Sequence, residues 1–387
     1  MKATSLVFGI CMLSLLKQTY AQSPEPIYSF ATELKPVTWY SQQAIAWKKE
    51  IDKNSKNAYA WYNYYRATRN LARLDTTDNR TGKDKWAAEK KIVEEMGKVV
   101  PESFEYNLCQ WMIGGNDYKY LPYLKKAASL GEDRPEIVSD MINIGETERD
   151  IKTRDKYAKV WYESKLASPG LLNYNYNVII GLKPNAILLT VGDNDTYPIW
   201  QLQSQGIRRD VSVLNLSLLN IDSYRDKIFK ELSIPKWDTS MHSGKSIHDL
   251  NPYHAEIIEH IASNSKLLPV YVALTTGPEY TESVEEKLYL TGLAYEYHNK
   301  SLDNMAILKK NFEQLYALDY LDKSFYKDIS AYYTVCVNQN YIVPMLKLYD
   351  HYVEAGELQK QEWIKNKIIA LAKNSAEEKE ILNHLKP

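Results

Sequence analysis

The chain has 387 residues, and its 48 basic and 49 acidic side chains leave a formal net charge of −1. This balance argues against binding to nucleic acid, which requires a concentrated basic surface, so no nucleic-acid partner is expected. Three cysteines are too few for a disulfide framework or a cysteine-based metal cluster, although a single disulfide between Cys109 and Cys336 is open.

The first 21 residues have the pattern of a secretory signal peptide. An apolar run spans residues 6–16, and Thr19 and Ala21 are placed as a cleavage site requires. Cys11 raises the competing interpretation of a lipoprotein signal, but the apolar run continues past it. Cleavage after Ala21 predicts an exported mature chain of charge −3, in the periplasm or outside the cell. No later stretch is apolar enough for a transmembrane segment.

Residues 22–183 are predicted to form a helical-repeat domain that resembles tetratricopeptide repeats. Three prolines recur at intervals of 34 residues, the spacing of such repeats, at Pro101, Pro135 and Pro169. The full repeat consensus is absent from every unit. Stacked repeats of this kind expose a concave surface, so the expected partner of this surface is an envelope protein or a glycan.

Residues 184–300 are predicted to form a small Rossmann-like α/β domain. Short, apolar, β-branched runs predict buried parallel strands at 185–192, 211–217 and 268–277. Helical patterns between and after them predict helices at 196–206, 223–232, 252–263 and 283–298. Residues 301–387 return to helical patterns and are expected to form a C-terminal helical region. The predicted fold class is therefore helical repeats followed by an α/β domain and further helices.

Polar residues follow the first predicted strand at the edge where open α/β sheets bind their ligands. This candidate ligand site consists of Asp193, Asn194, Asp195, Thr196 and Tyr197. The carboxylates of Asp193 and Asp195 suit a hard cation such as Mg²⁺ or Ca²⁺, which prefers oxygen ligands. No other cofactor is indicated.

A structural interpretation of the same loop stays open beside the ligand site. Gly192 permits a turn, Asp195 or Thr196 can cap the next helix, and Pro198 fits the first helical turn, where its missing N–H costs nothing. Under this interpretation the two carboxylates have no chemical role.

Other catalytic patterns are absent from the sequence. The histidines His242, His248, His254 and His260 recur every six residues, a spacing that points successive side chains of a helix in different directions. There is no G-x-S-x-G elbow, no P-loop and no dinucleotide fingerprint. The catalytic residues are therefore unknown, and a binding protein is favoured over an enzyme.

Two segments resemble a known family more specifically. Residues 187–224, which contain "GDNDTYP", and residues 268–297 resemble the extracytoplasmic part of a Bacteroidota membrane-protein family of unknown function. The membrane-spanning region of that family is similar to protein O-mannosyltransferases. The resemblance implies a soluble domain, a cell-envelope location and a link to glycosylation. It does not imply transferase activity, because the part that resembles the transferases is missing here.

Two functions follow as hypotheses. The first is an exported cell-envelope binding or scaffold protein, accessory to protein glycosylation or envelope assembly. The competing hypothesis is a divalent-cation-dependent hydrolase or transferase that uses Asp193 and Asp195.

Overall fold

The computed structural model describes residues 23–115, 117–237, 251–265, 267–323, 325 and 327–386. Two compact units divide the chain: the first comprises Met1–Ile27 and Pro36–Gly115, and the second comprises Tyr28–Lys35 and Asn116–Pro387. The predicted signal peptide, His242 and His248 lie outside the described residues. No described helix is both long and apolar enough to cross a bilayer.

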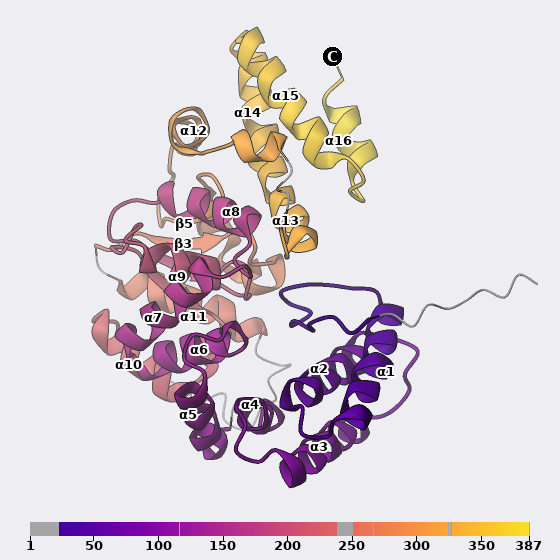
Figure 1. The fold of residues 1–387 in the computed structure, drawn as a ribbon. Coiled ribbons are helices and arrows are strands. Elements are labelled where there is room, and N and C mark those ends of the chain that lie inside the picture. The colour runs from indigo at the N-terminus through magenta and orange to yellow at the C-terminus, as the bar shows by residue number, and fades with distance from the viewer. Residues whose placement is uncertain are drawn as a thin grey trace, which may run out of the picture. The chain divides into compact units, whose positions relative to one another are not determined.

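The first unit is helical (Figure 1). Its helices are α1 (Val37–Lys53), α2 (Ala58–Leu74), α3 (Gly82–Val99) and α4 (Phe104–Ile113). Local sequence fixes where they begin: the Asn57 side chain accepts the Ala60 N–H at the start of α2, and Thr81 forms a reciprocal capping box with Asp84 at the start of α3. Helix α2 packs against α1, α3 and α4, and its Tyr65 is fully buried.

The second unit combines helices with one sheet. Its helices are α5 (Leu121–Leu130), α6 (Val138–Glu148), α7 (Ile151–Glu163), α8 (Pro169–Ile180), α9 (Tyr197–Ser204), α10 (Asp222–Glu231), α11 (Asn251–Asn264), α12 (Asn304–Lys310), α13 (Ala331–Asn338), α14 (Ile342–Glu354), α15 (Leu358–Ala372) and α16 (Glu378–His384). Its strands are β1 (Ile187–Thr190), β2 (Ser212–Asn215), β3 (Val270–Ala273), β4 (Leu288–Leu290) and β5 (Ala294–Tyr297). The expected combination of helices with a small sheet is confirmed.

The five strands form a mixed sheet in the order β2-β1-β3-β5-β4. The three predicted strands are parallel, with Leu188 of β1 opposite Val213 of β2 and Tyr271 of β3. Strand β5 runs antiparallel to β3, and β4 runs antiparallel to β5. All four residues of β1 are buried, as expected for a central parallel strand covered on both faces.

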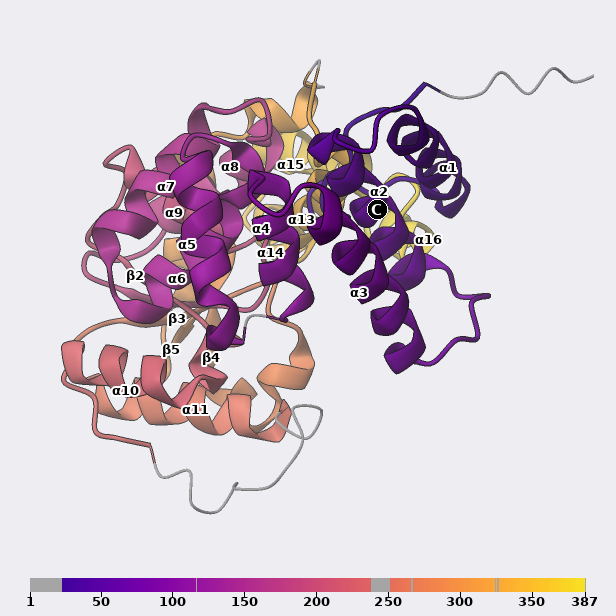
Figure 2. The same cartoon turned by 60° about the horizontal axis from the view of Figure 1, so that its bottom comes forward.

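Helices cover both faces of this sheet. Ile187 and Leu189 point to the face where α10 and α11 pack, and there they join a buried apolar cluster that includes Phe229 and Ile258. Figure 2 shows α10 and α11 together on this side, with α7, α8 and α9 on the other side. The layers leave the carboxyl ends of β1, β2 and β3 at one common edge, because these strands are parallel.

The predicted helix at 283–298 is wrong. A short 3-10 helix (Glu282–Lys287) leads there into the β4–β5 hairpin. The hairpin turn needs Gly292, because its φ is 158° and a Cβ there would lie 2.0 Å from the Tyr316 hydroxyl. Pairing with the free edge of β3 outweighs the local helical pattern, since Val272 lies opposite Tyr295.

Several expectations stay predictions. Helices are present within residues 22–183 as expected, and Pro169 stands in the first turn of α8, but a tetratricopeptide repeat is not established. The same holds for the Rossmann-like description and for the domain boundaries at residues 183 and 300. Cys109 and Cys336 have free thiols, the first buried and the second exposed.

Candidate functional site

The loop of residues 191–196 joins β1 to α9 at the carboxyl edge of the parallel strands. It is short because β1 ends at Thr190 and Tyr197 already begins the next helix. Pro198 lies in the first turn of α9, as the sequence predicts. The predicted candidate site thus lies at the carboxyl edge of the parallel strands.

Asp195 is buried and turns back onto its own loop. Its Oδ1 accepts the Gly192 N–H at 2.8 Å, and its Oδ2 accepts the Val191 N–H at 3.2 Å. Two hydroxyls also donate to it, Thr275 at 2.6 Å and Thr196 at 3.2 Å. A carboxylate offers about four acceptor positions, so the protein itself uses all of them.

The other loop residues are held in place by neighbouring elements. The Thr196 hydroxyl contacts the Thr190 hydroxyl at 2.7 Å and accepts from the Asn215 amide at 3.0 Å. The Asn194 carbonyl accepts from the Asn175 side chain of α8 at 2.8 Å. Neither Asp195 nor Thr196 caps α9 with its side chain, since α9 begins without a side-chain cap. The loop is therefore built as a closed hydrogen-bonded unit.

Tyr197 belongs to the aromatic packing behind the loop. Its ring centroid lies 5.2 Å from that of Trp161 on α7 and 5.8 Å from that of Trp200. Burial and the nearby charge of Asp193 raise the pKa of its phenol well above the ordinary value. The tyrosine is a neutral packing residue in this position.

The Asp193 side chain is exposed, and partial desolvation together with the negative charge of Asp195 raises the pKa of its carboxyl. The described residues contain no group of three or more acidic, cysteine or histidine side chains that could hold a metal ion. Mg²⁺ and Ca²⁺ need several oxygen ligands. Because hydrogen-bond donors of the protein already occupy the Asp195 oxygens, Asp193 and Asp195 do not fit a divalent cation.

Burial affects the ionisation of Asp195. It raises the pKa of this carboxyl above its ordinary value, while the bonds from Thr275, Val191 and Gly192 act in the opposite direction. Desolvation therefore disfavours the ionised form, and the surrounding donors favour it.

A cavity of about 930 Å³ adjoins this edge on the side of the β4–β5 hairpin. It is lined by residues that follow β3, by the 3-10 helix and hairpin, and by one residue each of α12 and α14: Leu274, Thr276, Gly277, Pro278, Glu279, Thr281, Glu282, Glu285, Leu288, Tyr289, Leu290, Tyr295, Asn304 and Lys347. This volume lies within the range of ligand-binding sites.

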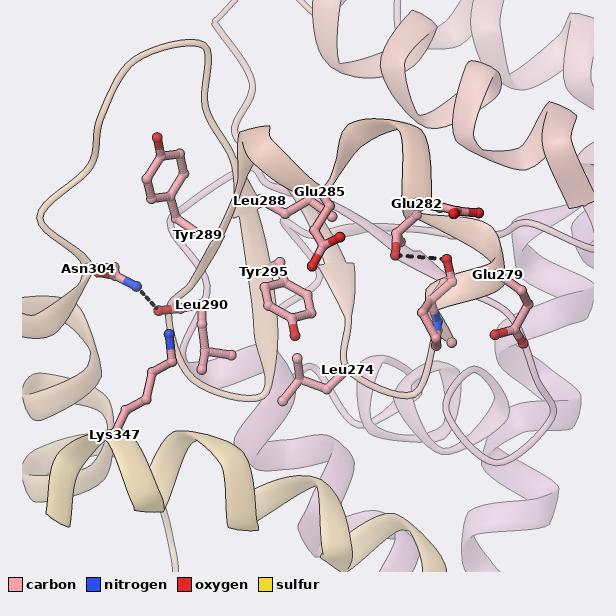
Figure 3. A pocket seen from close by; sticks show the side chains of 14 residues that line it. Leu274, Glu279, Glu282, Glu285, Leu288, Tyr289, Leu290, Tyr295, Asn304 and Lys347 are labelled. Atoms are coloured by element: carbon pink, nitrogen blue, oxygen red, sulfur yellow. Dashed lines mark hydrogen bonds between the residues drawn. The ribbon is translucent and has the colours of Figure 1, made fainter. Parts of the chain in front are cut away.

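The cavity brings opposite charges to different walls. Figure 3 shows the Glu285 carboxylate directed toward the Tyr295 ring, while Lys347 extends from α14 toward Asn304 and Leu290. The Asn304 amide is fixed by donation to the Leu290 carbonyl at 2.8 Å. Burial and the negative charge of Glu285 raise the pKa of Tyr295, so its hydroxyl stays protonated.

No sequence pattern pointed to this cavity, which lies beside the predicted loop. Thr275 connects the two places, because it donates to Asp195 while Leu274 and Thr276 on either side of it line the cavity. The available signal was the acidic run "GPEYTESVEE" (277–286), which directly follows the third predicted strand. Because residues 283–298 were predicted to form a helix, the sequence did not indicate that this acidic run lies beside the 191–196 loop.

His254 also lies at this edge but does not form part of the predicted loop. Its ring is buried against Tyr280, with the two ring centroids 4.9 Å apart. Burial lowers its pKa, with partial compensation from a backbone hydrogen bond at Leu216. The ring is therefore neutral near pH 7, as expected for a packed histidine.

Comparison with known proteins identifies one segment. Residues 172–236 match the TMEM260-associated domain 2 family. The matched segment runs from α8 through β1, the 191–196 loop, α9 and β2 to just beyond α10. The match supports the link to the protein O-mannosyltransferase-like family that the sequence resembles. No curated protein and no solved structure matches the chain.

Proposed function

We propose that this chain is an exported binding protein that is accessory to protein glycosylation in the cell envelope. The observation that carries the proposal is the match of residues 172–236 to a domain associated with a glycosylation-related family. The resemblance of residues 187–224 and 268–297 to a Bacteroidota envelope family supports the same location, as does the signal-peptide pattern of residues 1–21.

The site geometry favours binding over metal-dependent catalysis. The four bonds to Asp195 come from the protein's own donors, so the carboxylate has a structural role in the loop. The cavity beside the hairpin supplies carboxylates, a phenol and an ammonium, the groups that bind polar ligands. In this proposal the Tyr-rich helices of residues 22–183, a tetratricopeptide-like repeat, contact an envelope protein, and the Rossmann-like region contacts the glycan.

The proposal is tested in the source organism. Deletion of the coding gene is expected to lower the fraction of O-glycosylated sites on envelope proteins, measured by quantitative mass spectrometry of glycopeptides. Expression of the wild-type chain is expected to restore that fraction, and a chain without residues 1–21 is not. Unchanged glycopeptide occupancy after deletion contradicts the proposed function.

A further inference from the structure

The cavity beside the β4–β5 hairpin has hydrogen-bonding groups that the protein leaves open. Glu279, Glu282 and Glu285 are exposed at one side, and Lys347 is exposed at another. Within the described part of the chain, no ion pair within 4 Å joins Lys347 to any of these glutamates. Their charges are therefore held apart across the cavity, and a ligand can reach both.

The remaining lining is complementary to a ligand with apolar and polar faces. Leu274, Leu288 and Leu290 give an apolar surface, and the Tyr289 and Tyr295 rings are only half-buried. Aromatic rings of this kind present a broad apolar face together with a polar hydroxyl. The wall also contains Thr276, a buried residue whose hydroxyl has no hydrogen-bond partner in the described structure.

Three ligand classes fit this lining poorly. An anionic ligand meets three carboxylates for one ammonium, and an apolar ligand leaves every charged group without a partner. The cationic groups of a basic ligand pair with the glutamates, but they offer no acceptor to Lys347 and no apolar face to the leucines. Hydroxyl groups both donate and accept, so a polyhydroxylated neutral ligand satisfies carboxylate, ammonium and phenol at once.

We infer that the cavity between the 277–287 segment, the β4–β5 hairpin and Lys347 binds a short neutral oligosaccharide. This inference rests on the proposed function and gives it a binding site. Glu285 accepts from sugar hydroxyls, Lys347 donates to them, and Tyr295 does both while its ring covers a C–H face. The cavity volume of about 930 Å³ accommodates more than one sugar ring.

The test is isothermal titration of the purified mature chain with neutral hexose trisaccharides: mannotriose, maltotriose and cellotriose. At least one is expected to bind. Glu285→Gln and Tyr295→Phe are expected to weaken that binding about tenfold or more, because the first replaces a charged acceptor by a neutral amide and the second removes the phenol hydroxyl. Glu286→Gln is the matched control: Glu286 is adjacent and exposed but does not line the cavity, so affinity is expected to be unchanged.

Two further ligands separate the alternatives. Trilysine and a glucuronate-containing trisaccharide are expected to bind at least tenfold more weakly than the neutral sugar. Preferred binding of trilysine, or no binding of any neutral trisaccharide to the folded wild type at 5 mM, overturns the inference. If the deletion strain shows lowered glycopeptide occupancy but the chain binds no saccharide, the proposed function is retained and this binding site is rejected.

Discussion

Replacement of Asp195 tests whether the 191–196 loop depends on its carboxylate. In Asp195→Ala, the N–H groups of Val191 and Gly192 both lose their acceptor. A buried donor without a partner costs about 1–3 kcal/mol, so two such groups cost about 2–6 kcal/mol. Because both residues are half-buried and water can reach them, we expect the lower half of that range.

Asp195→Asn gives a smaller and more specific effect. Its single carbonyl oxygen can accept from only one of the two N–H groups, because they bond to different carboxylate oxygens. The other N–H then faces an amide donor, which costs about 1–3 kcal/mol. Asp193→Asn is the matched control. Because this side chain is exposed, the free energy of unfolding is expected to change by no more than about 0.5 kcal/mol.

The assay combines urea unfolding with hydrogen exchange. Unfolding free energies from tryptophan fluorescence give the stability change, and mass-spectrometric exchange of residues 187–200 shows whether the loop opens. Both Asp195 variants are expected to exchange faster in this segment than wild type. Equal stability of the Asp193→Asn and Asp195→Asn variants, with equal exchange, refutes the structural role of Asp195.

Further predictions concern ionisation, a buried ion cluster and export. The pKa of Asp195 is raised in the folded state, so the folded protein binds more protons than the unfolded chain just above pH 3.8. The unfolding free energy of wild type relative to Asp195→Asn is therefore expected to rise as the pH falls from 7 toward 4. The pKa of His254 is lowered in the folded state, so the unfolded chain takes up a proton at this residue first as the pH falls below 6.5. Wild type is therefore expected to lose stability there relative to His254→Gln, by at most about 1.4 kcal/mol per pH unit. For either residue, parallel pH profiles of wild type and variant contradict the prediction. Glu146 is fully buried and accepts hydrogen bonds from Arg154 at 2.8 Å and from the Tyr224 hydroxyl at 2.7 Å. Glu146→Ala is therefore expected to lower the free energy of urea unfolding by about 3–5 kcal/mol. The control Glu148→Ala, at an exposed residue, is expected to lower it by about 1 kcal/mol or less. Leu13→Arg places a charge in the apolar run of the signal peptide, so the precursor is expected to accumulate inside the cell at its uncleaved mass, and normal export of this variant counts against the signal peptide.

Local sequence was sufficient for the parallel part of the sheet. Strands β1, β2 and β3 lie within the predicted segments, because continuous apolar runs are typical of strands buried on both faces. The hairpin was missed because its stability is non-local. Glu296 of β5 is buried and accepts from the Tyr271 hydroxyl of β3 at 2.9 Å, a contact that no short sequence window contains.

The role of the two aspartates was open for the same reason. A carboxylate that follows a strand can bind a cation, cap a helix or stabilise a loop. Its hydrogen-bond partners in the folded chain show which of these roles it has. The shortest bond to Asp195 comes from Thr275, which is 80 residues away in the sequence. The lining of the neighbouring cavity likewise joins residues 274–295 to Lys347 of α14, which only the folded chain brings together.

One measurement connects the cavity with the cellular function. Glycopeptide occupancy of envelope proteins is measured in the deletion strain complemented with wild type, Glu285→Gln or Glu286→Gln at equal protein levels. We expect wild type and Glu286→Gln to restore occupancy, whereas Glu285→Gln leaves it near the level of the deletion strain. Equal restoration by all three chains, or no loss in the deletion strain, contradicts the role of the cavity in glycosylation.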